Sequence, residues 1–159
     1  MRGPVAWFLA TICVSLCLLV APANAGSASL TLKTALPLLQ AAAKKADAIG
    51  VPMVITVLDA GGNMIAQHRM DDALLASVEI SANKAYTAIA LKMPTSELAK
   101  LAQPGQPLFG IQNSSKIVIF GGGIPIVSNG KILGAIGVSG GAVEQDVECA
   151  KAGLAAFTQ

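Results

Sequence analysis

Hydrophobic positions recur at helical spacing in three long stretches of the chain. In the first stretch they step by four, three, four and three positions, in the series Ala35, Leu39, Ala42, Ala46 and Ile49. Such a stripe predicts an amphipathic helix that buries one face and ends before Gly50. Similar stripes predict helices over residues 75–92 and 142–157, and a short helix over residues 95–103 is expected after Pro94.

The first predicted helix has two candidate N-caps, Thr31 and Thr34. Threonine at this position can accept a hydrogen bond from a free amide of the first turn. Pro37 favours Thr34 as the cap, because proline fits best in the first turn, where its missing amide is not needed.

Short runs rich in apolar and β-branched residues lie between the helices and predict strands. They cover residues 53–58, 64–69, 116–120, 124–127 and 131–139. The nearly continuous apolar run at 53–58 indicates a central strand. Asn129-Gly130 tolerates the two positive φ angles of a type I′ turn, so the last two runs form a hairpin. Hairpin-linked strands run antiparallel, and the pattern therefore predicts the α+β class, a five-stranded antiparallel sheet flanked by helices.

The last predicted strand carries a glycine on each face, Gly134 and Gly137. Glycine inside a strand weakens its packing and usually marks close approach by another backbone or by a flat ligand. Gly140-Gly141 then opens the last helix, whose free amides are able to hold an anion. Glu144 and Asp146 are placed to serve that positive end instead.

The first 25 residues have the pattern of a secretory signal peptide. Arg2 precedes an apolar run over residues 5–20, and Ala23-Asn24-Ala25 is a small-x-small cleavage site. The run is shorter than the roughly 20 residues that span a bilayer, so we expect cleavage and no stable membrane anchor afterwards. Residues 26–159 are then a single domain, and we expect the protein to be periplasmic or secreted.

Charge and cysteine content narrow the possible partners. The chain has 11 Lys+Arg against 9 Asp+Glu, and no basic block, so we expect no nucleic-acid partner. Of its three cysteines only Cys149 lies beyond the predicted signal peptide, which excludes an internal disulfide in the exported domain.

His68 is the only histidine, which excludes sites that need two. If its strand alternates, the imidazole shares a face with Met64, Ala66 and Met70. An imidazole on an apolar face is able to ligate haem iron, with the methionines packing against the macrocycle. The alternative is a surface histidine at the end of a strand.

The predicted helix over residues 75–92 has a small, polar face that contains Ser77, Ser81 and Lys84. Ser81 and Lys84 also have the serine–lysine spacing of penicillin-binding enzymes, in which the lysine activates the serine. The lysine–threonine–glycine motif that supports this chemistry is absent. The alternative is a closely packed helix face from which Lys84 reaches an acidic partner.

Four motifs together resemble the GlcG/HbpS family of haem-binding proteins. They are DAGG at residues 59–62, RMD at 69–71, FGGGIP at 120–125 and GAIGVSG at 134–140. The resemblance runs from about Leu30 to Phe157. It implies a compact α+β domain with a five-stranded antiparallel sheet, profilin-like or PAS-like, that forms homo-oligomers. Members include secreted haem-binding proteins, the haem-binding domain of some corrinoid adenosyltransferases, and proteins of glycolate operons.

The chain departs from this family at Asp72, where members usually have glycine, and the added negative charge disfavours an anionic ligand nearby. The resemblance does not supply an invariant haem ligand, and Tyr86 is the alternative to His68. We expect a haem or other small-molecule site built from residues of the RMD loop, the polar helix face and the glycine-rich strand: His68, Arg69, Lys84, Tyr86, Gly137, Ser139 and Gly140.

Three hypotheses follow. The first is an exported haem (tetrapyrrole)-binding protein that acts in haem uptake, sensing or degradation, with His68 as the metal ligand. The second is an enzyme or accessory protein for a small organic acid, which uses the Lys84 face and the glycine-rich hairpin. The third is a homo-oligomer whose small-residue faces are subunit contacts, namely Ser77, Ser81 and Ala88 on the helix and Ala135, Gly137 and Ser139 on the strand.

Overall fold

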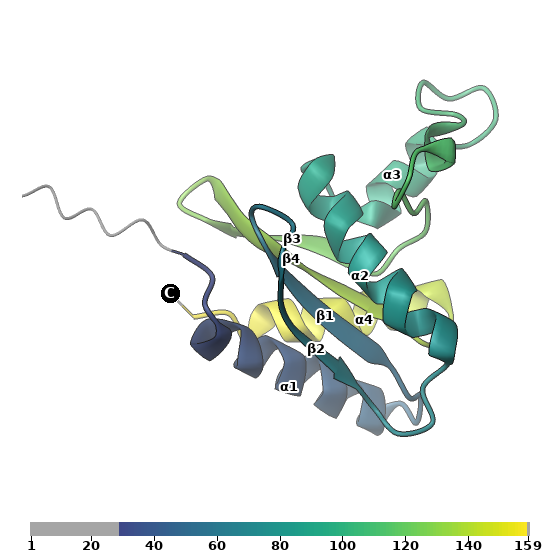
Figure 1. Cartoon of the computed structure of the whole chain (residues 1–159). Coiled ribbons are helices and arrows are strands. Elements are labelled where there is room, and N and C mark those ends of the chain that lie inside the picture. The colour runs from purple at the N-terminus through teal and green to yellow at the C-terminus, as the bar shows by residue number, and fades with distance from the viewer. Residues whose placement is uncertain (1–28, 159) are drawn as a thin grey trace, which may run out of the picture.

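The computed structural model describes residues 29–158, so the predicted signal peptide and its cleavage site lie outside the described residues. Helices and strands alternate in groups along the chain (Figure 1). In order they are α1 (Leu32–Ala48), β1 (Val54–Asp59), β2 (Met64–Arg69), α2 (Leu75–Ala90), α3 (Thr95–Leu101), a 3₁₀ turn η1 (Ile111–Asn113), β3 (Gly123–Ser128), β4 (Lys131–Ser139) and α4 (Val143–Ala155).

The strands form one antiparallel sheet in the order β2-β1-β4-β3. The continuous apolar strand β1 is central, as its sequence predicts. Two hairpins supply all four strands, and β1 and β4 pair between the hairpins. The α+β class and the antiparallel sheet are therefore confirmed.

The prediction of a fifth strand at residues 116–120 is wrong, since the described residues form a sheet of four strands. Lys116 adopts a positive φ of 68°, which is incompatible with an extended strand. The Thr87 hydroxyl donates to the Lys116 carbonyl at 3.1 Å and accepts from the Val118 amide at 3.0 Å. These backbone groups are thus satisfied by a side chain of α2 instead of by a neighbouring strand.

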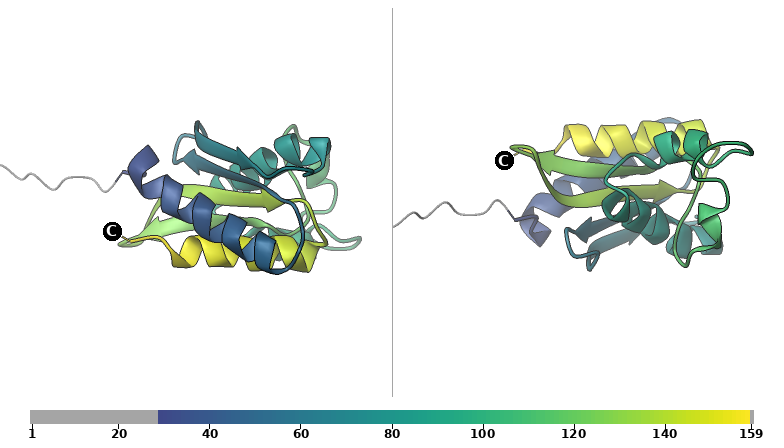
Figure 2. Two further views of the ribbon diagram at one scale, coloured as in Figure 1. Left: turned by 90° about the horizontal axis from the view of Figure 1, so that it is seen from below. Right: turned by 90° about the horizontal axis from the view of Figure 1, so that it is seen from above.

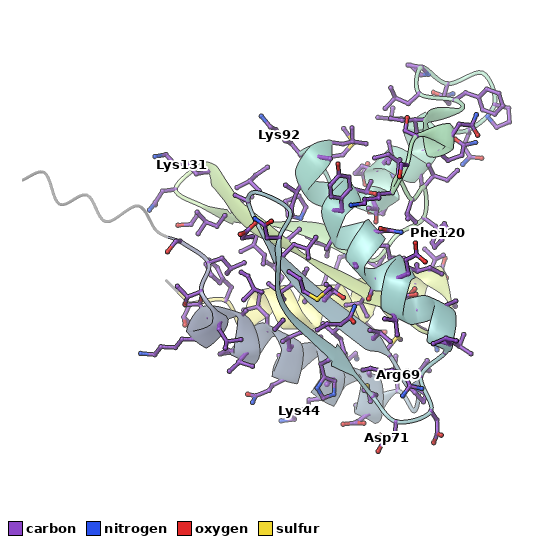
Figure 3. The ribbon with its side chains drawn as sticks, in the orientation of Figure 1. Lys44, Arg69, Asp71, Lys92, Phe120 and Lys131 are labelled. Carbon is purple, nitrogen blue, oxygen red and sulfur yellow. The ribbon has the colours of Figure 1, made fainter. Side chains whose placement is uncertain are left out.

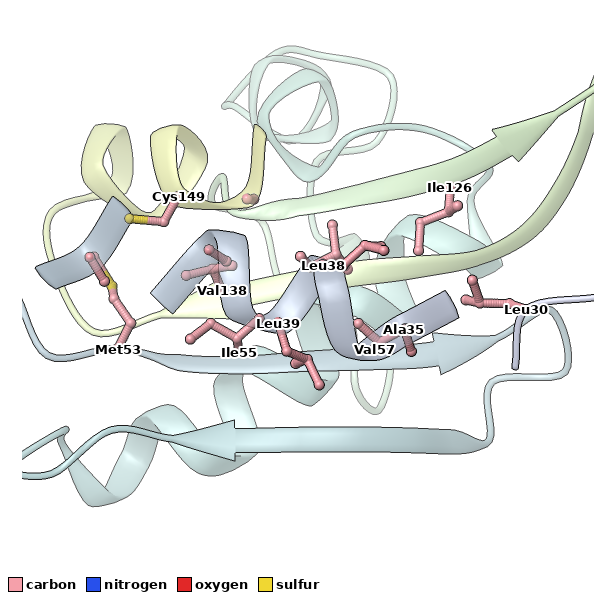
Figure 4. Close-up of a cluster of buried hydrophobic side chains, with 14 residues drawn as sticks. Leu30, Ala35, Leu38, Leu39, Met53, Ile55, Val57, Ile126, Val138 and Cys149 are labelled. Carbon is pink, nitrogen blue, oxygen red and sulfur yellow. The ribbon is translucent and has the colours of Figure 1, made fainter. Parts of the chain in front are cut away.

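Helices cover both faces of the sheet (Figure 2). On one face α1 and α4 lie side by side and enclose the main hydrophobic core with β1, β3 and β4 (Figure 4). That core includes Leu38, Ile55, Ile126 and Val138, all fully buried. On the other face α2 packs against β1, β3 and β4, and a smaller apolar cluster forms around Leu58.

Local signals explain most element boundaries. Thr31, and not Thr34, is the N-cap of α1, because each threonine side chain accepts the other's backbone amide in a reciprocal box. Pro37 therefore lies inside the helix, contrary to our expectation. Asn129 and Gly130 adopt φ angles of 48° and 75°, as a type I′ turn requires, which confirms the predicted hairpin.

Gly123 in β3 and Gly137 in β4 mark close approach by the backbone of α2. A Cβ added to Gly137 would collide with the carbonyl oxygen of Ser81, and one added to Gly123 would collide with that of Lys84. Helix α2 therefore lies directly on the sheet at these positions, which leaves no space for a flat ligand there.

The small-residue faces that we expected at subunit contacts meet each other inside one chain. Ser77, Ala88, Ala135, Gly137 and Ser139 are all buried between α2 and the sheet. These residues therefore no longer support an oligomer. Over residues 29–158 no helix combines the length and the apolar character needed to cross a membrane.

Candidate functional site

The polar face of α2 is buried against the sheet and is satisfied internally. The hydroxyl groups of Ser81 and Thr56 lie 2.8 Å apart, and Gln67 donates to the Thr56 hydroxyl at 2.8 Å. Nearer the start of the helix, Ser139 donates to the Ser77 hydroxyl at 3.2 Å. This face was predicted correctly as small and polar, but its polar groups stabilise the packing of the helix on the strands.

Lys84 is fully buried and forms an ion pair across the domain. Its ammonium group donates to Oδ2 of Asp146 at 2.5 Å and to the Val138 carbonyl at 2.9 Å, and it lies 5.1 Å from the centre of the Phe120 ring. Burial lowers the pKa of Lys84, and the hydrogen bond and charge of Asp146 oppose that shift. Lys84 therefore has an acidic partner, as the interpretation of this helix face as a closely packed one predicted. It does not pair with Ser81 as an activating base would.

Asp146 and its neighbour Gln145 occupy two of the amides that we considered for an external anion. Its Oδ1 accepts from the Gly141 amide at 3.0 Å, while Gln145 accepts from the Ala142 amide at 2.9 Å. A Cβ added to Gly140 would collide with the Pro52 carbonyl oxygen, so that glycine too allows close backbone packing. The start of α4 is thus capped by the chain itself.

Cys149 lies in the hydrophobic core between α4 and the sheet. Burial raises the pKa of its thiol to about 11. The thiolate is therefore scarce at neutral pH, and Cys149 acts as a small apolar core residue.

An open depression of about 550 Å³ lies where the end of α1 meets the end of β2. His68 pairs with Ile55, and paired residues point to the same face, so the imidazole is on the α1 side of the sheet. It is exposed on the edge strand and lines the depression. The other lining residues are Ala43, Ala46, Asp47, Gly50, Val51, Pro52, Arg69, Met70 and Asp71.

Arg69 and the residues after it form one rim of this depression (Figure 3). The Arg69 guanidinium donates to the Ala73 carbonyl at 2.7 Å, which ties it to the loop before α2. Asp72 adopts a positive φ of 61°. That conformation explains why glycine is usual here in the resembled family, since glycine enters the left-handed region without steric cost.

Tyr86 lies away from this depression. An added Cβ at Gly62 would touch its ring, and the ammonium group of Lys116 lies 5.3 Å from the ring centre. The expected site residues therefore separate into three places. His68 and Arg69 line the depression, Tyr86 lies near the β1–β2 turn, and the remaining four pack between α2, β4 and the neighbouring loops.

The wall that α1 contributes to the depression was not predicted from the sequence. Another part of the depression did have a sequence signal, namely the β1–β2 hairpin. The hairpin sets Ile55 opposite His68 and so brings Val51 and Pro52 close to Met70. The small side chains of Ala43 and Ala46 then leave room beside the imidazole.

Comparison with known proteins gives a consistent result. The model of the family "Haem degrading protein HbpS-like" matches residues 30–155. An uncharacterised 15.0 kDa protein from the dhaT-dhaS intergenic region of Citrobacter freundii is 49% identical over 134 residues, which are 83% of this chain and 94% of that protein.

Two further matches concern corrinoid adenosyltransferases and haem. The corrinoid adenosyltransferase PduO of Citrobacter freundii is 43% identical over 122 residues, which are 76% of this chain but only 36% of that enzyme. The chain thus spans about a third of that relative. The crystal structure of a PduOC–haem complex matches with a TM-score of 0.80 and 39% identity, over 82% of this chain and 96% of the other.

We predict that Lys84 and Asp146 stabilise the fold only as a pair. Lys84→Met alone should lower the free energy of unfolding by about 3–5 kcal/mol, because it leaves a buried carboxylate without its counter-ion. Adding Asp146→Asn should recover part of this loss, since the amide oxygen still accepts from Gly141. Urea denaturation followed by circular dichroism measures both.

The control is the pair Lys45–Glu148, whose Nζ–Oε1 distance is 2.6 Å and in which Lys45 is half-buried and Glu148 exposed. Lys45→Met should cost much less than Lys84→Met, because solvent screens this pair. Equal losses for Lys45→Met and Lys84→Met, or additive losses in the Lys84–Asp146 double variant, would contradict the assignment.

Proposed function

The chain belongs to the HbpS-like family of haem-degrading proteins, and from this premise we propose that it binds haem in the depression beside His68. The observation that carries the proposal is the placement of the chain's single imidazole at the edge of an open depression lined by both apolar and charged residues. Its volume, about 550 Å³, lies in the usual range for small-molecule sites, roughly 300–1,000 Å³. The solved PduOC–haem complex supports the class of ligand.

The residues of the depression suit a tetrapyrrole. Neutral imidazole is a common axial ligand of haem iron. Ala43, Val51 and Met70 offer apolar surface for one face of the macrocycle. When bound, the haem iron would supply the redox and ligand-binding chemistry, and the chain would hold and orient it.

Charges around the depression define how haem would be oriented. Asp47 and Asp71 repel carboxylates, whereas Arg69 is the one positively charged lining residue. Its hydrogen bond to the Ala73 carbonyl fixes the guanidinium and leaves its other N–H groups available. Arg69 would therefore hold the haem propionates, and the two aspartates would disfavour them nearby.

The small-organic-acid hypothesis assumed that Lys84 is free to bind a ligand, and the structure removes this basis. The ammonium group is fully buried and already holds Asp146 and the Val138 carbonyl. An external carboxylate would have to displace Asp146 from inside the domain. Tyr86 is likewise a weaker candidate for the haem ligand, because it does not line the depression.

We predict that His68→Ala weakens hemin binding and shifts the Soret band. Loss of the axial nitrogen should raise the dissociation constant at least about tenfold, since even partners that only orient a metal ligand contribute 10–100-fold. His68→Met, which replaces the imidazole with a thioether, should retain binding with an altered spectrum. Absorption titrations with hemin measure both effects.

Two further variants test the location. Tyr86→Phe should leave the spectrum and affinity unchanged. Ala43→Phe should fill the depression and weaken binding while the His68 imidazole is kept. The proposal fails if His68→Ala binds hemin with an unaltered spectrum while Tyr86→Phe changes the spectrum. The ligand would then be Tyr86.

We also propose that the protein is exported and begins at Gly26, which leaves 159 − 25 = 134 residues. The support is the Ala23-Asn24-Ala25 site after an uncharged apolar run. N-terminal sequencing of protein from the periplasm or culture medium should read Gly26 first. Intact Met1 in a membrane fraction is the opposite result.

We propose, finally, that the protein is a homo-oligomer, now on the basis of exposed apolar groups. Leu74 and Leu75 are 63% and 84% exposed at the start of α2, and β2 is an edge strand in the sheet that residues 29–158 form. Light scattering at micromolar concentration should give a multiple of the chain mass, and Leu75→Glu should lower it. A single-chain mass for the unsubstituted protein would refute this.

A further inference from the structure

A second depression, of about 490 Å³, lies at another end of the domain from His68. Three segments distant in sequence meet there, namely the β1–β2 turn, the end of α2 and the β3–β4 hairpin. The lining residues are Ala60, Ile89, Lys92, Gly130, Lys131 and Ile132. The two lysines lie on the side of the molecule away from Arg69 and Asp71 (Figure 3).

Lys92 is held in an unusual backbone conformation. It follows Leu91, the C-cap of α2, and adopts a positive φ of 55°. Glycine or asparagine is favoured at such a position, because other side chains are strained there. Backbone strain of this kind is often retained at functional sites, which makes the Lys92 side chain a candidate for ligand binding.

The two ammonium groups are available to a ligand. The ion pairs among residues 29–158 use Lys45, Lys84 and Lys100, and neither Lys92 nor Lys131. Both lysines are exposed.

The carboxylate of the neighbouring β1–β2 turn is already engaged. Asp59 accepts from the Asn63 amide at 2.9 Å, from the Asn63 side chain at 3.1 Å and from the Gly61 amide at 2.8 Å. These hydrogen bonds, those of Asn63 first, lower the pKa of Asp59. Asp59 therefore stabilises its own turn instead of neutralising the lysines.

We propose that this depression binds the carboxylate of a small aliphatic acid. Ile89, Ile132 and Ala60 offer apolar surface for an aliphatic body, and the lysines offer two positive charges for its carboxylate. An inorganic anion would use the charges alone. The site is separate from the proposed haem site. It places the binding of a small acid at the tip of the β3–β4 hairpin and not at Lys84.

Nuclear magnetic resonance titration with hexanoate tests the proposal. Millimolar hexanoate should shift the backbone amides of Ala60, Lys92, Gly130 and Ile132, and added salt should weaken the effect by screening. Hexanol, which lacks the charge, and inorganic phosphate, which lacks the apolar body, should each bind more weakly.

Charge-matched variants identify the lysines. Lys131→Gln and Lys92→Asn, of which the latter tolerates the positive φ, should each raise the dissociation constant for hexanoate by about two- to fivefold. Lys44→Gln removes the same charge from an exposed position on α1 and should leave the dissociation constant for hexanoate unchanged. Neither variant of the site should alter hemin titration, so failure here is distinguishable from failure of the haem proposal.

Two outcomes would overturn the proposal. One is the absence of hexanoate-induced shifts at the named amides, which would mean that the lysines only keep this end of the domain soluble. The other is an equal loss of affinity in Lys44→Gln and Lys131→Gln, which would indicate nonspecific attraction to the net charge of the protein.

Discussion

The buried contact between Lys84 and Asp146 determines how the two faces of this domain fit together. Lys84 belongs to α2 on one face of the sheet, and Asp146 belongs to α4 on the other. Two charges taken out of water are tolerated only if each keeps its partner and its remaining hydrogen bonds. The Val138 carbonyl and the Gly141 amide supply those bonds, so the end of β4 and the start of α4 are held by the same contact. A Cβ added to Gly122 would collide with the Val138 carbonyl oxygen and crowd the Lys84 ammonium group, which explains the glycine there.

This arrangement changes which residues are available for chemistry. The sequence suggests a reactive site from Lys84, the hydroxyl groups near it on α2 and the glycine-rich strand β4. In the structure these groups pack α2 on the sheet. Ligands must therefore be sought at the periphery, where α1 meets β2 and where the hairpins meet the end of α2. The first of these places holds the chain's single imidazole, and the second holds two lysines that take no part in the ion pairs of the described residues.

Features that depend on neighbouring residues were predictable from the sequence, and features that depend on distant contacts were not. Asn129-Gly130 specifies its turn locally, and the stripe from Ala35 to Ile49 specifies a helix. The run at residues 116–120 has strand composition, but Thr87, about 30 residues earlier, takes its hydrogen bonds. The partner of Lys84 lies 62 residues along the chain, so only its type could be anticipated. For His68, strand alternation correctly predicted a face shared with Ala66. The prediction for Met64 is wrong, because a register shift in the β1–β2 pair sets Met64 opposite Leu58, on the α2 side of the sheet. The wall supplied by α1 required the packing of the helix.

We propose that haem occupies the depression beside His68 and not the buried polar face of α2. Paramagnetic broadening by ferric haem reports directly on location, because amide signals close to the iron are lost. In spectra of the protein with hemin, we predict loss of the amide signals of Val51, His68 and Met70, while those of Gly130 and Lys131 remain. Broadening centred on Tyr86, or spread evenly over the surface, would contradict it.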